Sequence, residues 1–178
     1  MTAHPPDLAP QMLIGALTRF YGAVDRRVRQ LQGTHGARLR CRRGCSGCCV
    51  DGLTVFEVEA RYIRHHCGRL LAAEVPHPAG ACALLDAEGA CRIYSYRPYV
   101  CRTQGLPLRW IDQLSDGSPV EMRDICPVNE AGPPVERLPA KSCWTIGPFE
   151  QTLSRLQTAD GSRRLLRVPL RALMQGRP

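Results

Sequence analysis

The first long amphipathic pattern lies between residues 10 and 32, where apolar residues recur every three or four positions. This period is that of an α-helix with one face turned toward a protein core. Pro10 suits a first helical turn, and Gly33 suits the position just after a helix end. The sequence therefore predicts a helix over 10–32, and its buried stripe comprises Leu13, Ala16, Leu17, Phe20, Val24 and Leu31.

A second helical pattern begins at Thr54, because Thr54 and Glu57 have the spacing of a capping box. One apolar stripe then extends to about residue 72 and comprises Phe56, Ala60, Ile63 and Cys67. Since Cys67 shares the apolar face, we expect it to be a small core residue and not a metal ligand.

The second half of the chain predicts a hairpin and one more helix. Asp116 and Gly117 separate two short runs of alternating polar and apolar residues, which is typical of a β-hairpin. Pro148 starts a helical pattern that continues to about Thr158, and Gly161 is expected to end it.

Residues 76–105 and the proline-rich residues 127–142 show neither a helical nor a strand period. The sequence thus predicts an α+β fold: a small, helix-rich single domain with an irregular, metal-organised cysteine lobe and a short β-hairpin. The expected domain limits are a flexible lead over 1–9, a single cysteine-cluster domain over 10–160 with its metal motifs at 41–126, and a basic tail over 161–178.

Composition narrows the functional class. The 178 residues contain no apolar run long enough to span a membrane, and the first residues lack the basic and apolar regions of a secretory signal. We therefore expect a cytoplasmic protein, in which ten cysteines indicate metal or redox chemistry and not disulfides. The net charge of +8 comes almost entirely from arginine. Metal-bound thiolates would offset much of it, which disfavours nucleic acid as a partner.

The most informative motif is a run of four cysteines within nine residues, Cys41, Cys45, Cys48 and Cys49. The two-residue gap between Cys45 and Cys48 lets both sulfurs reach one ion. Cys48 and Cys49 are adjacent, so in extended backbone their side chains would point to opposite faces and serve different ions. A tight turn around Gly47 would instead bring both inward.

More thiols follow at Cys82, Cys91, Cys101 and Cys126, while Cys143 is set aside with Cys67. A closed zinc site built from cysteine needs four donors, and a [4Fe-4S] cluster also needs about four. The remaining eight cysteines fit two full sites, or one cluster with spare thiols.

These blocks resemble a known family. The first block is the cysteine run, the second extends from Cys82 to Cys91, and the third extends from Tyr94 to Arg102 around Arg97-Pro-Tyr-Val-Cys101. Together they look like the YkgJ or "CxxCxxCC" group, whose members are described as zinc- or iron-chelating proteins and sometimes as iron–sulfur oxidoreductases. Two departures are the three-residue gap after Cys41 and the alanine after Cys82. The resemblance implies a metal-binding module with core ligands Cys45, Cys48, Cys49, Cys82, Cys91 and Cys101, followed by Cys41 and Cys126.

Polar residues beside the predicted ligands are further candidates. Tyr94, Arg97 and Arg102 could bind a cofactor or donate hydrogen bonds to sulfur, and the two arginines could contact an anionic substrate. Alternatively, they pack and pair with nearby carboxylates. Among the histidines, His35 is the best placed to replace a cysteine at zinc.

Three functions remain open, and no catalytic residue is assigned. The first is a mainly structural metal site, most simply zinc. The second is an iron–sulfur protein, either an oxidoreductase or an electron carrier with a redox partner protein. The third is metal storage or delivery through exposed thiols such as Cys49. The first three cysteines also match the spacing of radical S-adenosylmethionine enzymes, but the chain lacks the large barrel that those enzymes need.

Overall fold

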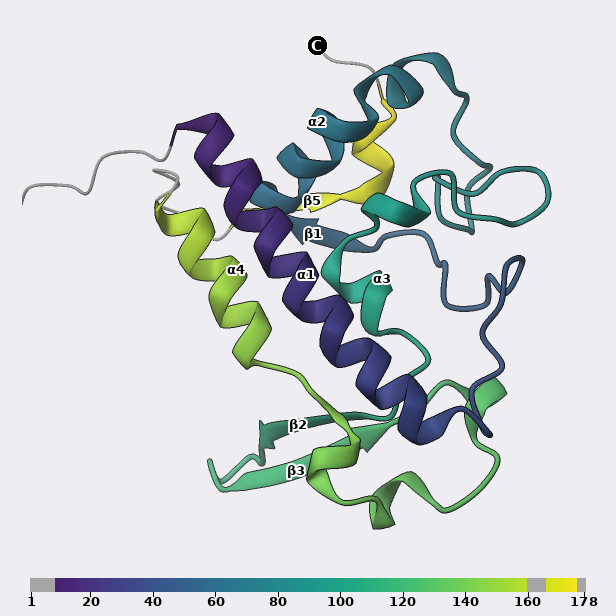
Figure 1. The fold of residues 1–178 in the computed structure, drawn as a ribbon, viewed down its shortest axis with the longest axis vertical. Helices are drawn as coiled ribbons and strands as arrows, with labels where there is room; N and C mark the ends of the chain where they lie inside the picture. The colour runs from purple at the N-terminus through teal and green to yellow at the C-terminus, as the bar shows by residue number, and fades with distance from the viewer. Residues whose placement is uncertain (1–8, 160–165, 176–178) are drawn as a thin grey trace, which may run out of the picture.

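A computed structural model describes residues 9–159 and 166–175 of the chain. In this part the chain forms helices α1 (Pro10–His35), α2 (Glu57–Ala73), α3 (Tyr99–Thr103) and α4 (Pro148–Ala159), and strands β1 (Thr54–Phe56), β2 (Leu108–Gln113), β3 (Pro119–Asp124), β4 (Trp144–Thr145) and β5 (Arg167–Pro169). The architecture is the predicted α+β fold with small sheets. Figure 1 shows α4 beside α1, the β2–β3 hairpin at one end of α1, and α2 with β1 and β5 at the other.

The predicted first helix is present and longer than expected. Five residues of its apolar stripe are buried, namely Leu13, Leu17, Phe20, Val24 and Leu31. The sixth, Ala16, is half-buried. Gly33 lies inside the helix, which ends at His35. The ring Nε2–H of His35 donates to the carbonyl of Ser142 at 2.6 Å, so a contact distant in sequence holds the last turn.

The second helix starts later than the capping-box pattern predicts. Thr54 is not its cap, because residues 54–56 form β1 and pair antiparallel with β5. Glu59 takes over the capping role, since its Oε2 accepts the backbone N–H of Phe56 at 3.1 Å. A strand partner more than a hundred residues away in sequence therefore overrides the local cap signal.

The hairpin and helix α4 agree with the sequence prediction, and Gly161, which was expected to end that helix, lies outside the described residues. β2 and β3 pair from Leu108 with Asp124 to Gln113 with Pro119, and the turn lies at Asp116 and Gly117. Gly117 has φ +80°, a backbone conformation that favours glycine. β4 adds to the free edge of β2 in parallel.

Two hydrophobic clusters divide the interior. The first core cluster joins α1, the start of α2, α3 and α4 around the fully buried Trp144. The second core cluster lies on another face of α2 and comprises Val55, Ala60, Ile63, Cys67, Leu71, the segment 82–85, Ile93, Leu170, Leu173 and Met174. Residues 170–174 follow β5, so the segment after β5 completes the second core cluster.

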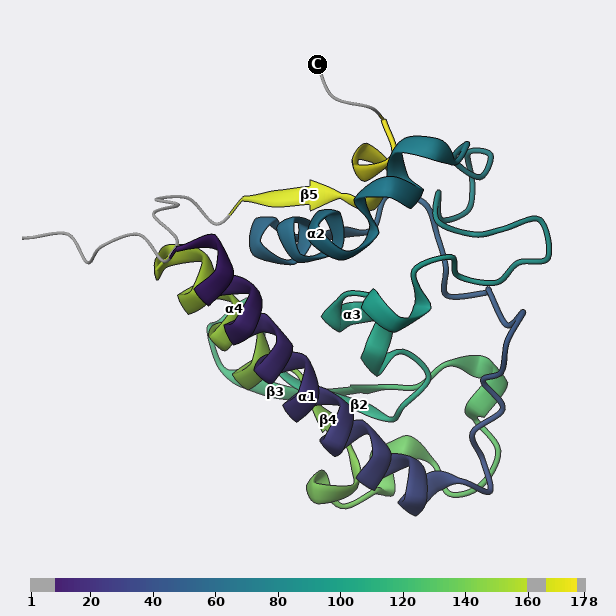
Figure 2. The same ribbon diagram turned by 45° about the horizontal axis from the view of Figure 1, so that its top comes forward.

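The loops that carry the cysteines lie together on one side of the molecule. Both views place the segments 36–53 and 74–93 on the side of α1 away from α4 (Figure 1, Figure 2). These segments contain isolated backbone bridges and turns in place of regular elements. The irregular lobe predicted over 76–105 is therefore present up to residue 93, whereas Tyr99–Thr103 form the short helix α3, which the sequence pattern did not predict.

Candidate metal centre

The cysteine run is folded into two consecutive tight turns. The backbone N–H of Cys45 donates to the carbonyl of Arg42 at 2.9 Å, and that of Cys49 to the carbonyl of Ser46 at 2.8 Å. Gly44, in the first turn, has φ +83°. This backbone is not extended, so the expectation that Cys48 and Cys49 point to opposite faces is wrong and the alternative of a tight turn around Gly47 is correct.

The adjacent thiols Cys48 and Cys49 are hydrogen-bonded to each other. This bond lowers the pKa of Cys48 to about 6, because the thiol of Cys49 donates to the sulfur of Cys48. The same bond raises the pKa of Cys49, and burial raises it further. The lowered pKa favours the thiolate at Cys48, and the thiolate is the form that binds metals.

The downstream loop is brought against the run by backbone pairing. The N–H of Cys82 donates to the carbonyl of Cys49 at 2.8 Å, and Val50 forms a bridge with Ala81. A second bridge pairs Leu85 with Cys91 and folds the 82–91 segment back on itself. Residues that are more than thirty positions apart in sequence thus form one ligand-bearing surface.

Two sulfurs of this loop accept backbone hydrogen bonds from the residue two positions later. Leu84 donates to the sulfur of Cys82 and Ile93 to that of Cys91, and each bond opposes the increase in thiol pKa that burial causes. A hydrogen bond to sulfur favours the charged thiolate form. Both hydrogen bonds therefore favour the form in which a cysteine binds metal, against the effect of burial.

Cys101 is placed by the buried carboxylate of Glu59. Glu59 Oε1 accepts the backbone N–H of Tyr99 at 2.8 Å and the hydroxyl of Tyr21 at 3.0 Å, which holds the start of α3 against α1 and α2. Burial raises the pKa of Glu59. Burial likewise raises the pKa of Cys101 to about 12, and the neighbouring thiolates of Cys82, Cys91 and Cys48 add to this effect.

The mutual electrostatic effects separate the predicted ligands into two sets. We call Cys41, Cys45 and Cys126 the first thiol group, since after burial the charges of Cys45 and Cys126 raise the pKa of Cys41. The second thiol group is Cys49, Cys82, Cys91 and Cys101, since the charges of Cys82 and Cys91 raise the pKa of Cys101, and those of Cys101 and Cys82 raise the pKa of Cys49. Cys48 is hydrogen-bonded to Cys49 of the second group, and its charge also raises the pKa of Cys41 in the first.

The thiol groups are not arranged as finished coordination sites. In residues 9–159 and 166–175, no three His, Cys, Asp or Glu side chains stand close enough to hold one ion. A change between staggered positions at the Cα–Cβ bond moves a cysteine sulfur by about 3 Å. Closure of either group on a metal therefore requires side chains to turn, whereas the donor chemistry already suits zinc or iron.

Asn129 is a site residue that sequence reasoning missed. It is fully buried, and its side-chain Nδ2 donates to Cys41 Sγ at 3.3 Å and to the carbonyl of Gly105 at 2.7 Å. Its backbone N–H donates to the carbonyl of Cys126 at 2.7 Å. The only available signal was that Asn129 is the single asparagine of the chain and lies three residues after a predicted ligand.

Arg171 links the loop after Cys49 to the loop before Cys82. Its Nε donates to both carboxylate oxygens of Asp51 at 2.8 and 3.0 Å. Its other nitrogens donate to the carbonyls of His77, Pro78 and Ala81. Asp51 follows Cys49 and Ala81 precedes Cys82, so one guanidinium fixes the spacing of two predicted ligands.

The predicted cofactor-binding residues have structural partners. Arg102 is buried and donates to both carboxylate oxygens of Asp25, at 2.9 and 2.8 Å, which ties α3 to α1. Arg97 stacks on the exposed ring of Tyr94 with 4.0 Å from its guanidinium carbon to the ring centroid. Arg102 therefore has a structural role between α1 and α3, whereas Tyr94 and Arg97 lie at the surface near Cys91 and Cys101 in the sequence.

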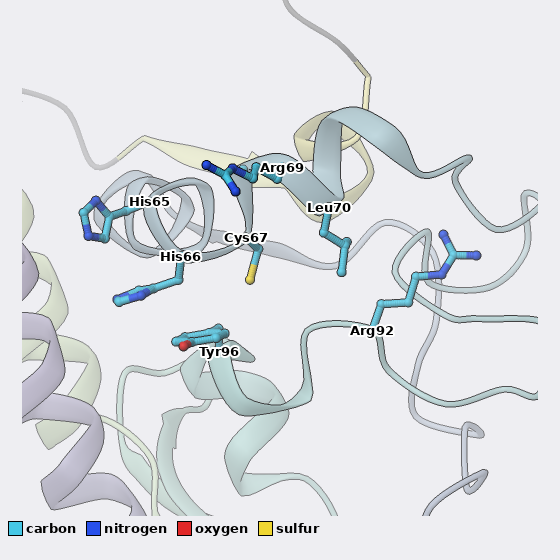
Figure 3. Close-up of a pocket in the computed structure, with 8 residues that line it drawn as sticks. His65, His66, Cys67, Arg69, Leu70, Arg92 and Tyr96 are labelled. Atoms are coloured by element: carbon cyan, nitrogen blue, oxygen red, sulfur yellow. The ribbon is translucent and has the colours of Figure 1, made fainter.

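The other set-aside residues also have defined places. Cys67 is buried in the second core cluster, as the stripe predicts, and Cys143 is 1% exposed. A shallow cavity of about 530 Å³ opens over Cys67. Figure 3 shows the Cys67 side chain directed from α2 toward Tyr96, on which the ring of His66 stacks with 4.5 Å between centroids. His35 donates to a carbonyl, which makes it part of the α1 terminus and not of either thiol group.

Comparison with known proteins gives a family match. Residues 40–127 match the CxxCxxCC family, described as "Putative zinc- or iron-chelating domain". No curated protein and no solved structure matches the chain. The matched range includes both thiol groups and agrees with the family that the cysteine spacing resembles. In the part of the chain that the structure describes, no helix is both long and apolar enough to cross a membrane.

Proposed function

Because residues 40–127 belong to the CxxCxxCC family, we propose that this protein binds zinc or iron through cysteine thiolates of both its cysteine run and its downstream loops. The observation that carries the proposal is the pairing of Cys49 with Cys82 through a 2.8 Å backbone hydrogen bond. It joins the two halves of the ligand set, which the sequence separates by more than thirty residues. Thiolates are the donors that zinc and iron–sulfur clusters share.

We further propose two sites and not one. The second thiol group supplies four donors, which is the number needed for a closed site. The first thiol group supplies three, and Cys48, whose charge also acts on Cys41, would be its fourth donor. The action of Cys45 and Cys126 on Cys41, and of Cys82 and Cys91 on Cys101, is in line with this division.

The surroundings of the second thiol group favour a structural role, most simply with zinc. Cys82 belongs to the second core cluster, and Cys49 and Cys91 pack against it. The loops that carry these residues form isolated bridges and turns in place of helices or sheets, so metal binding would add folding free energy to this lobe. All ten cysteines are free thiols, which suits the reducing cytoplasm as the compartment.

The surroundings of the first thiol group favour a second candidate function, electron transfer by an iron–sulfur protein with an acidic redox partner. Cys41 is exposed, and Arg40, Arg42 and Arg43 beside it are exposed as well. Cationic side chains would offset the negative charge of a thiolate-bound cluster and attract an acidic surface. An iron–sulfur cluster would supply one-electron redox chemistry here.

Anaerobic purification followed by metal analysis and visible spectroscopy tests these proposals. A colourless protein with about two zinc ions per chain supports the structural role, whereas iron with stoichiometric sulfide and absorption near ~400 nm supports the redox role. In the variants C82A and C101A the metal content should fall, and in C143A it should not, because Cys143 lies outside both groups. A metal content that is equal in C82A, C101A and C143A would contradict metal binding by the second thiol group.

A further inference from the structure

We propose that Asn129 is a positioning residue for the thiolate of Cys41, which it orients toward a bound metal by donating a side-chain N–H to the sulfur. This inference rests on the proposed metal-binding function and deepens it. Asn129 lies two residues beyond the segment that matches the family. The positioning role of Asn129 is therefore inferred from its own hydrogen bonds in this chain.

The orientation of the Asn129 amide is determined by two neutral partners. Its Oδ1 accepts the backbone N–H of Arg40 at 2.7 Å, and a backbone N–H can only donate. Its Nδ2 donates to the carbonyl of Gly105 at 2.7 Å, and a carbonyl can only accept. The amide cannot be flipped without losing both bonds. The second hydrogen of Nδ2 therefore faces Cys41 Sγ at 3.3 Å.

The backbone of Asn129 is also fixed by hydrogen bonds on both sides. Its N–H donates to the carbonyl of Cys126, and its own carbonyl accepts Nε–H of Arg38 at 2.9 Å. Arg38 is buried and also donates to the carbonyls of Glu130 and Pro133. Arg38 thus holds the backbone of this loop, whereas the bonds of Oδ1 to Arg40 and of Nδ2 to Gly105 orient the Asn129 side chain relative to the sulfur.

Gly105 forms the other wall of the sulfur site. A Cβ atom at this position would lie 2.5 Å from Cys41 Sγ and 3.0 Å from Asn129 Nδ2. The sulfur of Cys41 is thus enclosed between a glycine and an amide donor, although the residue as a whole is exposed. A buried N–H donor forms a stronger hydrogen bond with a thiolate than with a neutral thiol, and the thiolate is the form that ligates metal.

The same contacts connect both ends of the first thiol group. Asn129 touches Cys41 through its side chain and Cys126 through its backbone, which are 85 residues apart. It therefore sets the distance between these two ligands as well as the direction of one sulfur. Hydrogen-bonded partners of metal ligands commonly change metal affinity by 10- to 100-fold when they are replaced.

The test compares N129D with R38Q in the full chain. N129D keeps the acceptor for Arg40 and removes both N–H donors, whereas R38Q loosens the same loop without touching the sulfur. Zinc affinity is measured by competition with a chromophoric chelator, and alkylation of each cysteine in the zinc-saturated protein is located by mass spectrometry. We expect N129D to bind one zinc about 10- to 100-fold more weakly. Its Cys41 should become alkylated while Cys82 and Cys101 stay protected.

R38Q is expected to leave Cys41 protected. Equal labelling of Cys41 in N129D and R38Q would assign Asn129 a loop-stabilising role and overturn the inference, as would wild-type affinity in N129D. If N129D fails to fold by circular dichroism, N129S, which removes the donor without adding a charge, is measured in its place. A wild-type protein that takes up neither zinc nor iron overturns the proposed function and this inference together. Metal uptake with unchanged Cys41 protection in N129D and N129S overturns the inference alone.

Discussion

Substitution of Gly105 by alanine should destabilise the protein through a direct collision with Cys41. The new Cβ would lie 2.5 Å from Cys41 Sγ, a separation that real Cβ atoms essentially never show. Gly105 also has φ +86°, which alanine adopts only with strain. G105A therefore combines a backbone cost with a steric cost.

The two costs can be separated because the chain offers a matched control. Gly117 has φ +80°, yet a Cβ there would meet nothing within 4 Å. G117A should therefore cost only the backbone strain, about 1–2 kcal/mol. In G105A the sulfur must retreat by about 1 Å to reach ordinary contact distance. Overpacking of this kind costs about 1–3 kcal/mol more, so we expect a total of about 2–5 kcal/mol.

Urea unfolding of the metal-free proteins, followed by circular dichroism, measures these differences. The double variant C41A/G105A provides the decisive comparison, because removal of the sulfur leaves the Cys41 Cβ at 3.9 Å, an ordinary contact, and only the 3.0 Å approach to Asn129 Nδ2 stays tight. The coupling free energy from the cycle should be about 1–3 kcal/mol in favour of the double variant. Equal destabilisation by G105A and G117A, or additivity of C41A and G105A, would refute the proposed contact between residue 105 and the sulfur.

Three further predictions follow from other contacts. The hydrogen bond from Arg171 is the main cause that lowers the pKa of Asp51. The stabilisation by this ion pair is therefore present above the ordinary carboxyl pKa of about 3.9 and is lost as pH falls through the lower pKa of the folded protein. The difference in unfolding free energy between wild type and D51N should shrink over that acid range, and a constant difference would contradict the ion pair. L170A should cost about 2–5 kcal/mol in urea unfolding, because Leu170 is 3% exposed in the second core cluster, and a cost under about 0.5 kcal/mol would show that the segment after β5 is not packed. Y99F should cost about 1–3 kcal/mol and change tryptophan fluorescence, because the indole N–H of Trp144 donates to the Tyr99 hydroxyl at 2.8 Å, and an unchanged stability would argue that this buried donor finds another acceptor.

The elements that depend on local patterns were predicted from the sequence. The buried stripe of α1, the hairpin turn at Asp116 and Gly117, and the helix that starts at Pro148 each follow from a short period or a turn signal. Cys67 was expected in the core because it shares a helix face with Ile63, and it lies there.

The parts that were mispredicted depend on contacts between distant residues. Thr54 carries a valid local cap signal, but pairing with β5 draws it into a strand. Cys48 and Cys49 were expected on opposite faces, and the turn at Ser46 places them together. Asn129 has no spacing relation to Cys41, and only the folded chain brings them together. Which metal binds, and whether it is structural or redox-active, depends on chemistry that neither spacing nor packing determines.

The pairing of β1 with β5 imposes an order on biosynthesis. The ribosome releases the cysteine run and the 82–91 loop long before it releases Leu170, Leu173 and Met174, which complete the core behind that loop. Domains fold as units during synthesis, so the nascent chain exposes Cys49, Cys67, Cys82 and Cys91 before their packing surface is complete. The protein therefore acquires its final thiol geometry only after residues 170–174 have left the ribosome, and metal binding to the complete geometry is expected after that point.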